Sequence, residues 1–309
     1  MNDIILHHYA SSPFAEKIRL ILGAKGLAWR SVEIPWIMPK PDLVALTGGY
    51  RRTPVLQIGA DIYCDTALIA RVLDARSASV PLFPANRAAA VSVAELADRD
   101  LFAAAVAYVF QPAGFAALFQ GMGKAQIDAF MDDRKAMRAG GSSRMAVPEA
   151  LGQLHAWLQR ISDHLADGRR FLVADSPTIA DFSVYHPLWF VGRAPALATV
   201  LGRYPGVADW VTRMAAIGQG SSTPMTSGEA LETARAARPA DVEGHVWVDY
   251  HGCQPGDEVE IEPADYGIVP VRGRLVVSSA QRLSVARSDE RAGEVVVHFP
   301  RVGYRMRKG

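Results

Sequence analysis

Three short segments of the sequence carry residue types that could act on a small ligand. They are Ser11-Ser12-Pro13-Phe14-Ala15-Glu16, Arg51-Arg52-Thr53-Pro54 and Asp65-Thr66. Hydroxyl and carboxylate side chains at such positions often cap the free N–H groups at the start of a helix. The same N–H groups and the helix dipole attract anions, so a cap can also serve a bound ligand. Taken one at a time, the segments leave both interpretations open.

Ser12 stands directly before Pro13, and proline is favoured at the first position of a helix. The Ser12 hydroxyl is therefore expected either to accept a backbone N–H of the first turn or to stabilise an anion such as a thiolate. The two cysteines, Cys64 and Cys253, lie far apart and have neither metal-ligand nor redox spacing, so we expect reduced thiols and no metal site. A serine hydroxyl at position 12 cannot supply the thiol nucleophile that disulfide chemistry needs.

The other two segments allow a similar pair of interpretations. A proline at position 54 either simply starts a strand or forms a cis bond that turns the Thr53 backbone outward, where it could receive an extended peptide ligand. Asp65 and Thr66 stand between a short strand and a helix, so they either cap the helix or hold the amino and carboxylate ends of an amino-acid-like ligand. Arg52 is either solvated or binds an anionic substrate.

A strand-helix unit must position these segments. The apolar patterns predict, in chain order, a strand over Ile4–Tyr9, a helix from Pro13, a strand over Ser31–Ile34, a helix over Pro41–Leu46, strands over Pro54–Ile58 and Ile62–Cys64, and a helix over Thr66–Arg76. This order is typical of a small α/β unit with one mixed sheet. Small residues and prolines over 77–84 break the helical pattern, so we assign the first domain to residues 1–80.

The rest of the chain divides into a helical region, 85–235, and a β-rich region, 240–309. Helical spacing covers Arg87–Phe110, Lys124–Ala139 and Pro148–Ala166, and Thr178 with Asp181 has the form of a capping box. Gly218–Gly228 is expected to be a mobile loop. In the last region, strands are expected at Val246–Val248, Val259–Ile261, Leu275–Val277 and Val295–Val297. No motif assigns a role to this region.

The composition of the 309 residues excludes several classes of function. A net charge of +1 gives no whole-molecule field that would attract nucleic acid or an anionic membrane. No segment approaches the about 18 apolar residues of a membrane span, and the N-terminus lacks a basic stretch followed by a long apolar run. We therefore expect a soluble, cytoplasmic protein with no nucleic-acid or membrane partner. His7, His8 and His298 are expected to be structural.

Together, the order and spacing of the three segments resemble the thioredoxin-like domain of the glutathione transferase superfamily. The omega class has a Cys-Pro-Phe-Ala-Glu run where this chain has Ser12-Pro13-Phe14-Ala15-Glu16, and zeta-type enzymes have a catalytic serine at that place. Farther along, Thr178-x-x-Asp181 resembles the hallmark of the transferase helical domain, and the stretch from Tyr204 to Met214 resembles its last core helix. The resemblance covers about residues 1 to 217.

This resemblance implies a thioredoxin-like α/β N-terminal domain followed by an all-α helix-bundle domain, with glutathione as co-substrate. The small all-β module at the end has no counterpart in ordinary transferases. In the same comparison Ser12 is the catalytic residue. From the resemblance and the residues together, the expected substrate-binding residues are Phe14, Lys40, Arg52, Thr53, Pro54, Asp65 and Thr66. Lys40 would meet the glycine carboxylate, whereas Asp65 and Thr66 would hold the γ-glutamyl end.

The expected function is therefore binding of glutathione and attack of its thiolate on a small electrophile that the sequence does not identify. The resemblance also implies a homodimer. Threonine replaces the usual valine before Pro54, and Asp65-Thr66 replaces the usual Glu-Ser pair. These departures, with the added β-rich tail, favour an alternative: a non-catalytic binding or scaffold protein that acts through its tail.

Overall fold

The first part of the chain forms a small mixed sheet with helices packed against it. The computed structural model describes residues 3–84, 87–141, 143–240 and 246–309. The N-terminal elements are β1 (Ile5–His8), α1 (Pro13–Ala24), β2 (Trp29–Glu33), α2 (Pro41–Thr47), β3 (Val55–Ile58), β4 (Asp61–Cys64) and α3 (Thr66–Arg76). Strand β1 pairs parallel with β2 and antiparallel with β3, and β3 pairs antiparallel with β4. The predicted α/β fold is confirmed.

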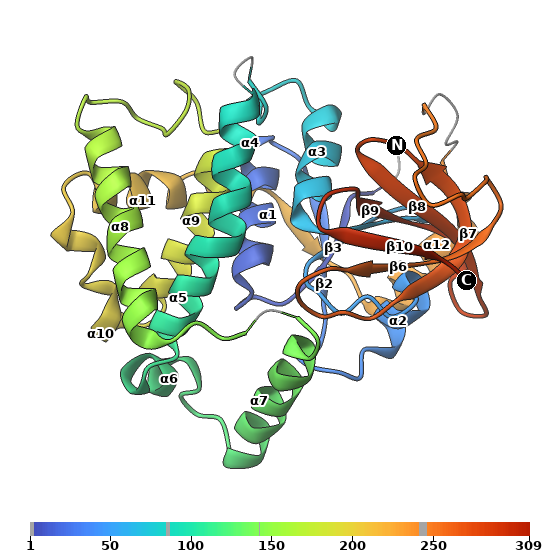
Figure 1. The fold of residues 1–309 in the computed structure, drawn as a ribbon, viewed down its shortest axis with the longest axis horizontal. Helices are drawn as coiled ribbons and strands as arrows, with labels where there is room; N and C mark the ends of the chain where they lie inside the picture. The colour runs from blue at the N-terminus through green and yellow to red at the C-terminus, as the bar shows by residue number, and fades with distance from the viewer. Residues whose placement is uncertain (1–2, 85–86, 142, 241–245) are drawn as a thin grey trace.

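The helical region packs against α1 and forms the opposite side of the molecule from the C-terminal strands (Figure 1). Its elements are α4 (Arg87–Leu96), the π-helical turn η1 (Ala97–Leu101), α5 (Phe102–Val109), α6 (Pro112–Leu118), α7 (Lys124–Arg138), α8 (Val147–Leu165), α9 (Ile179–Gly192), α10 (Pro195–Ala198), η2 (Leu201–Arg203) and α11 (Val207–Ala215). Ile18 and Leu22 of α1 share one core with Leu158 of α8 and Phe182 of α9. Within the described chain no single helix is long and apolar enough to cross a membrane, although the bent pair Ala88–Val109 and Pro112–Leu118 meets the length and composition requirements.

Helix α9 starts at the predicted capping box, which is fully buried. The Asp181 carboxylate accepts the backbone N–H of Thr178 at 2.9 Å and that of Leu172 at 2.8 Å. The indole N–H of Trp210 donates to the same carboxylate at 3.3 Å. Burial raises the pKa of Asp181, and these hydrogen bonds oppose that rise. A motif that starts a helix therefore also ties α9 to α11.

The C-terminal strands extend the sheet of the first domain rather than forming a separate one. The remaining elements are β5 (Ser222–Pro224), α12 (Ser227–Ala236), β6 (Glu258–Pro263), β7 (Val271–Ser278), β8 (Arg282–Asp289), β9 (Gly293–Pro300) and β10 (Tyr304–Lys308). Over the described residues one sheet of ten strands runs in the order β10-β6-β7-β8-β9-β4-β3-β1-β2-β5. Its centre is the parallel pairing of β4 with β9, in which Ile62 lies opposite Val297.

Pairing of β9 with β4 brings the tail into a core shared with the first domain. Ile5 and Ile62 from the N-terminal strands lie in this core with Val285, Val297 and Phe299 of the tail, all of them buried. Burial of each such side chain contributes about 1.5–3 kcal/mol. The tail, residues 246–309 here, therefore shares a core with the first domain. The division at 1–80, 85–235 and 240–309 stays a prediction, and residues 85–86 and 241–245 at its boundaries lie outside the described residues.

Two local expectations are wrong. Val246–Val248 forms no strand; instead the Val248 N–H donates to the carbonyl of Ser278 at 2.7 Å, beside the end of β7. Gly218–Gly228, expected to be a loop, contains β5, which pairs with β2, and the start of α12. In both places the presence of a strand depends on a segment distant in the sequence. A strand needs a neighbouring strand to hydrogen-bond with, and β-branched residues alone do not supply one.

Candidate functional site

Ser12 lies at the N-terminus of α1 beside a tyrosine that the sequence did not single out. The Ser12 hydroxyl accepts the N–H of Ala15 at 3.2 Å, and the residue is 3% exposed. The Tyr9 phenol lies close enough to the side chains of Ser12 and Arg134 for both to lower its pKa. Burial raises the pKa of Tyr9 more than the positive charge of Arg134 lowers it, so the phenol keeps its proton. Two hydroxyl groups and a guanidinium therefore meet at one helix N-terminus.

Lys40 is a buried cation that forms no ion pair with any described residue. It is 5% exposed, and its ammonium donates to the Thr53 hydroxyl at 3.4 Å. Among the described residues no carboxylate oxygen lies within the 4.0 Å of an ion pair. Burial lowers the pKa of Lys40 to about 8, the positive charges of Arg134 and Arg51 add to this effect, and Asp133 opposes it.

Helix α7 brings the charges that surround Lys40. Asp133 pairs with Arg51 at 2.6 Å and lies 3.9 Å from Arg134. Arg134 also donates to the carbonyl of Trp36 at 2.6 Å, which fixes its guanidinium beside the loop before Lys40. One carboxylate cannot balance these positive groups together, so this end of the site has an excess of positive charge.

The Thr53–Pro54 peptide is cis, one of the two alternatives that the sequence leaves open. It lies just before β3, and the Thr53 hydroxyl is the group that Lys40 reaches. The Lys40 ammonium also lies 5.8 Å from the centroid of the Tyr9 ring. Ser12, Tyr9, Lys40 and Thr53 are thus neighbours in space. We call these residues, together with Asp65 and Thr66, the site arc.

Asp65 continues the site arc on the far side of Pro54. It is the N-cap of α3 with a φ of 75°, and its carboxylate accepts the N–H of Ala67 at 3.0 Å. Its second oxygen accepts the phenol of Tyr304 at 3.1 Å and lies 3.7 Å from Arg52. A positive φ is strained for a residue other than glycine, and here it directs the carboxylate toward the tail.

Thr66 joins the site arc to the helical region through a buried charge network. Its hydroxyl accepts from the Lys17 ammonium at 3.3 Å, and Lys17 pairs with Asp98 of η1 at 2.6 Å. His186 of α9 contacts the other Asp98 oxygen at 3.0 Å. Burial alone would raise the pKa of Asp98, but Lys17 and His186 hold it at about 2. Burial lowers the pKa of His186, so its ring is neutral.

Two of the predicted residues face neighbouring parts of the chain. The centroid of the Phe14 ring lies 4.5 Å from the ring centroid of His186 and 4.6 Å from that of Phe102. Phe14 therefore packs between the two domains. The Arg52 guanidinium donates twice to the backbone carbonyl of Tyr266 in the tail, at 2.9 and 2.6 Å. Their assignment to substrate binding stays a prediction.

Sequence reasoning missed the groups that approach the site arc from elsewhere in the chain. These are Tyr9, Lys17, Asp98, Arg134, Tyr266 and Tyr304. Tyr9 ends an ordinary strand pattern, and the charged residues lie on helices where solvated side chains are usual. A capping or turn signal is local, whereas these contacts come from elements that only the fold brings together.

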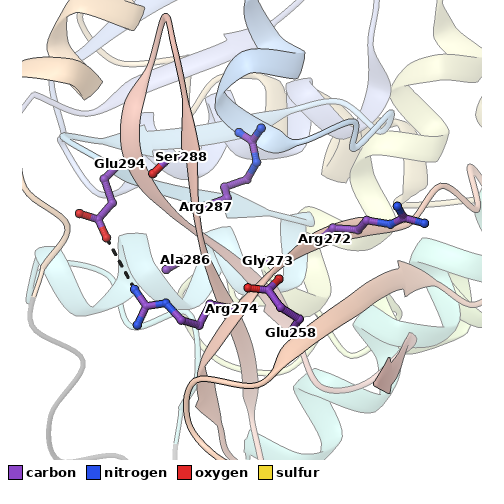
Figure 2. A pocket seen from close by; sticks show the side chains of 8 residues that line it. All are labelled: Glu258, Arg272, Gly273, Arg274, Ala286, Arg287, Ser288 and Glu294. Atoms are coloured by element: carbon purple, nitrogen blue, oxygen red, sulfur yellow. Dashed lines mark ion pairs between the residues drawn. The ribbon is translucent and has the colours of Figure 1, made fainter. Parts of the chain in front are cut away.

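A hollow of about 330 Å³ on the tail lies apart from the site arc. Its lining residues, drawn in Figure 2, are Glu258, Arg272, Gly273, Arg274, Ala286, Arg287, Ser288 and Glu294. Arg274 and Glu294 form an ion pair there at 3.8 Å, and Arg287 reaches the carbonyl of Ala45 on α2. None of the sequence-predicted site residues lines this hollow, which is a surface of mixed charge.

His298 has a serine and a carboxylate on either side, yet its setting is structural. Its ring nitrogens contact Ser284 at 2.8 Å and Asp61 at 2.9 Å. All of these side chains are buried, and the ring of Tyr63 stacks on the imidazole at 4.5 Å. No substrate can reach the serine, so the series links β8 and β9 to β4.

Comparisons with known proteins agree with this fold. Residues 6–81 match the glutathione S-transferase N-terminal domain, and residues 144–213 match the glutathione S-transferase C-terminal domain. A GST-like protein from Pseudomonas syringae is 42% identical over 100% of both chains, with a TM-score of 0.84. A search among curated proteins found no match.

More distant structures match the first two thirds of the chain. Glutathione S-transferase III in its apo form covers 69% of this chain and 92% of its own, at 22% identity and a TM-score of 0.53. A Tau class glutathione S-transferase from mango, Mangifera indica, covers 69% of this chain and 89% of its own, at 18% identity and a TM-score of 0.51. These two show the fold alone, whereas the Pseudomonas syringae protein matches the tail as well. The chain belongs to the glutathione transferase superfamily.

Proposed function

We propose that this protein binds glutathione along the site arc and promotes attack of the glutathione thiolate on a small electrophile. The observation that carries the proposal is Lys40, a buried ammonium with no carboxylate partner in the described structure and with further positive charge beside it. A buried charge is costly unless it is paired, so this position favours a ligand that brings an anion. The glycine carboxylate of glutathione would supply that anion.

The rest of the site arc suits the other parts of the tripeptide. The backbone at Thr53 would hold the cysteinyl part as an extended strand. Asp65 would accept the α-ammonium of the γ-glutamyl group. The Thr66 hydroxyl accepts from Lys17, which leaves its own proton free to donate to the γ-glutamyl carboxylate. Phe14 and Arg52 would border the ligand on either side of these contacts.

Ser12 would act on the sulfur. Its oxygen accepts the Ala15 N–H, so the hydroxyl proton can donate to a thiolate while the cap stays in place. Lowering a thiol pKa by about two units requires about 2.7 kcal/mol of preferential thiolate stabilisation. A charge-assisted hydrogen bond at a helix N-terminus supplies an amount of that order. The thiolate would then form a bond to the electrophilic carbon, whose leaving group departs with the electron pair.

Calorimetric titration tests this proposal. We expect saturable binding of glutathione with a Kd below about 1 mM. This Kd corresponds to a favourable binding free energy of about 4 kcal/mol or more. Lys40→Met should weaken glutathione binding about 10- to 100-fold, because a hydrogen-bonded charge pair contributes about 1.5–3 kcal/mol. The same substitution should leave the affinity for glutathione glycine ethyl ester nearly unchanged, because the ester carries no charge at that end. Lys124→Met, at an exposed lysine, is the matched control.

Activity of the same proteins separates catalysis from binding. Ser12→Ala should bind glutathione with nearly wild-type affinity but lose most of its turnover with several electrophiles. Unchanged turnover would remove Ser12 from the mechanism. Absence of glutathione binding at millimolar concentration would favour the alternative of a scaffold protein, for which the engagement of Arg52 and Asp65 by the tail is the supporting observation. A homodimer in the cytoplasm remains part of the proposal.

A further inference from the structure

The tail reaches the site arc through Tyr304, the first residue of β10. Its phenol donates to Asp65 at 3.1 Å and lies 3.0 Å from the phenol oxygen of Tyr50. Its ring packs 5.4 Å from that of Phe299, and the guanidinium of Arg52 lies 5.9 Å above it. A residue more than two hundred positions away in the sequence therefore fixes the carboxylate of Asp65 in the first domain.

A second contact holds the tail at the same place. Arg52 forms an ion pair with Asp265 as well as its hydrogen bonds to the Tyr266 carbonyl. The N–H of Gly267 donates to the carbonyl of Met137 at the end of α7, at 2.7 Å. The loop between β6 and β7 thus bridges the loop before β3 and α7, so Tyr304 does not depend on a single interaction for its position.

We propose that Tyr304 is a positioning residue for glutathione, supplied by the tail, which holds the Asp65 carboxylate in the orientation that receives the γ-glutamyl ammonium. This inference rests on the proposed function. One Asp65 oxygen caps α3 and the other accepts the phenol, yet each carboxylate oxygen has a further lone pair for the incoming ammonium. Burial raises the pKa of Tyr304 well above its ordinary value, so the phenol stays a donor at physiological pH.

Two opposite effects of the phenol can be told apart. A hydrogen bond withdraws negative charge from the carboxylate and so weakens its attraction for an ammonium, whereas a fixed orientation removes the cost of ordering Asp65 when the ligand binds. Our inference is that orientation dominates, because Asp65 lies at a strained φ and Arg52 at 3.7 Å competes for its oxygen. Loss of the phenol would let the carboxylate turn toward that guanidinium.

The test is calorimetry of Tyr304→Phe with two ligands. Glutathione should bind about 5- to 10-fold more weakly than to the wild type, in line with about 1 kcal/mol for one hydrogen bond. Glutaryl-cysteinyl-glycine, which lacks only the α-ammonium, should bind both proteins within about twofold of each other. Phenylalanine at position 304 keeps the ring contacts. Tyr50→Phe leaves the bond between Tyr304 and Asp65 in place. It should therefore weaken glutathione binding less than Tyr304→Phe does, again with little effect on the ligand that lacks the ammonium.

Each outcome has a defined meaning. Equal or tighter binding of glutathione by Tyr304→Phe overturns the inference, and so does an equal loss for both ligands, which indicates a merely structural role. Tyr250→Phe, at an exposed tyrosine of the tail, should bind both ligands as the wild type does. If the wild type itself binds no glutathione, the proposed function fails, and the inference that rests on it fails with it.

Discussion

Lys40 shows how a residue proposed to bind a ligand can lower the stability of the free protein. Its pKa is about 8 in the fold against an ordinary value of 10.5, so between these values the unfolded chain binds more protons than the folded one. Stability attributable to Lys40 therefore rises as the pH increases from 8 to 10.5. Below pH 8 the ammonium is charged in both states, and its destabilising effect is fully present.

We predict that Lys40→Met increases the free energy of unfolding of the ligand-free protein by about 1–3 kcal/mol at pH 7. The advantage over the wild type should shrink between pH 8 and 10.5, because there the folded wild type can lose the proton from Lys40. Urea denaturation of both proteins at pH 7 and pH 9.5 measures this difference. A Lys40→Met protein that is less stable than the wild type at pH 7 would contradict the assignment of Lys40 as an unpaired buried charge.

Among the elements, the turn after α7 shows how closely the tail packs on the helical region. A Cβ atom built on Gly141 would lie 1.9 Å from the backbone carbonyl oxygen of Asp265. Backbone cannot retreat as a flexible side chain can, so any residue larger than glycine must displace the loop that also holds Arg52. The close contact between the turn after α7 and the tail therefore requires glycine, which has no Cβ atom, at position 141.

We expect Gly141→Ala to lower the free energy of unfolding by about 1–3 kcal/mol through this overlap. Gly152, an exposed glycine inside α8 with nothing within 4 Å of its would-be Cβ, is the matched control. Gly152→Ala should raise stability by about 0.5–1 kcal/mol, because alanine favours a helix interior. Denaturant titrations of the two variants should thus shift in opposite directions; a stabilised Gly141→Ala would mean that the tail yields freely.

The same elements show what the sequence could predict. The starts of α1 and α3 depend on a proline, a serine and an aspartate next to the helix, so local patterns were enough to place Ser12 and Asp65 correctly as caps. The pairing of β4 with β9 and the approach of Tyr304 to Asp65 depend on chain segments far apart. No local pattern encodes which strand pairs with which edge, so the sequence alone predicts a β-rich module without its neighbours.

At the scale of the whole molecule, the tail and the first domain are joined into one layer of structure. They share the sheet, the core around Val297 and Phe299, and the contacts to Arg52 and Asp65. The helical region packs on the other side of α1, and its core is shared with that helix, because Ile18 and Leu22 lie in the same cluster as Phe182. Loss of the tail should therefore damage the first domain more than the helical one.

We predict that a chain of residues 1–239 keeps most of its helical far-ultraviolet circular dichroism but binds a dye for exposed apolar surface and associates into large species. The physical reason is that Ile5 and Ile62 would lose their apolar neighbours in the tail, and β4 would regain an unpaired edge. Sedimentation velocity and dye fluorescence measure this, with the full chain as reference. A monodisperse fragment that binds no dye would show that the first domain is complete without the tail.

The pairing of β4 with β9 also places a demand on synthesis. A ribosome adds about 5–20 residues per second, so the strand at Ile62 waits roughly 10 to 50 seconds before its neighbour at Val297 has been made. Throughout that interval the nascent chain presents an open strand edge and an uncovered apolar face to other chains on the same messenger. The speed of translation between Ile62 and Val297 should therefore affect the yield of native protein. Chaperones that bind the nascent chain at the ribosome should affect it as well.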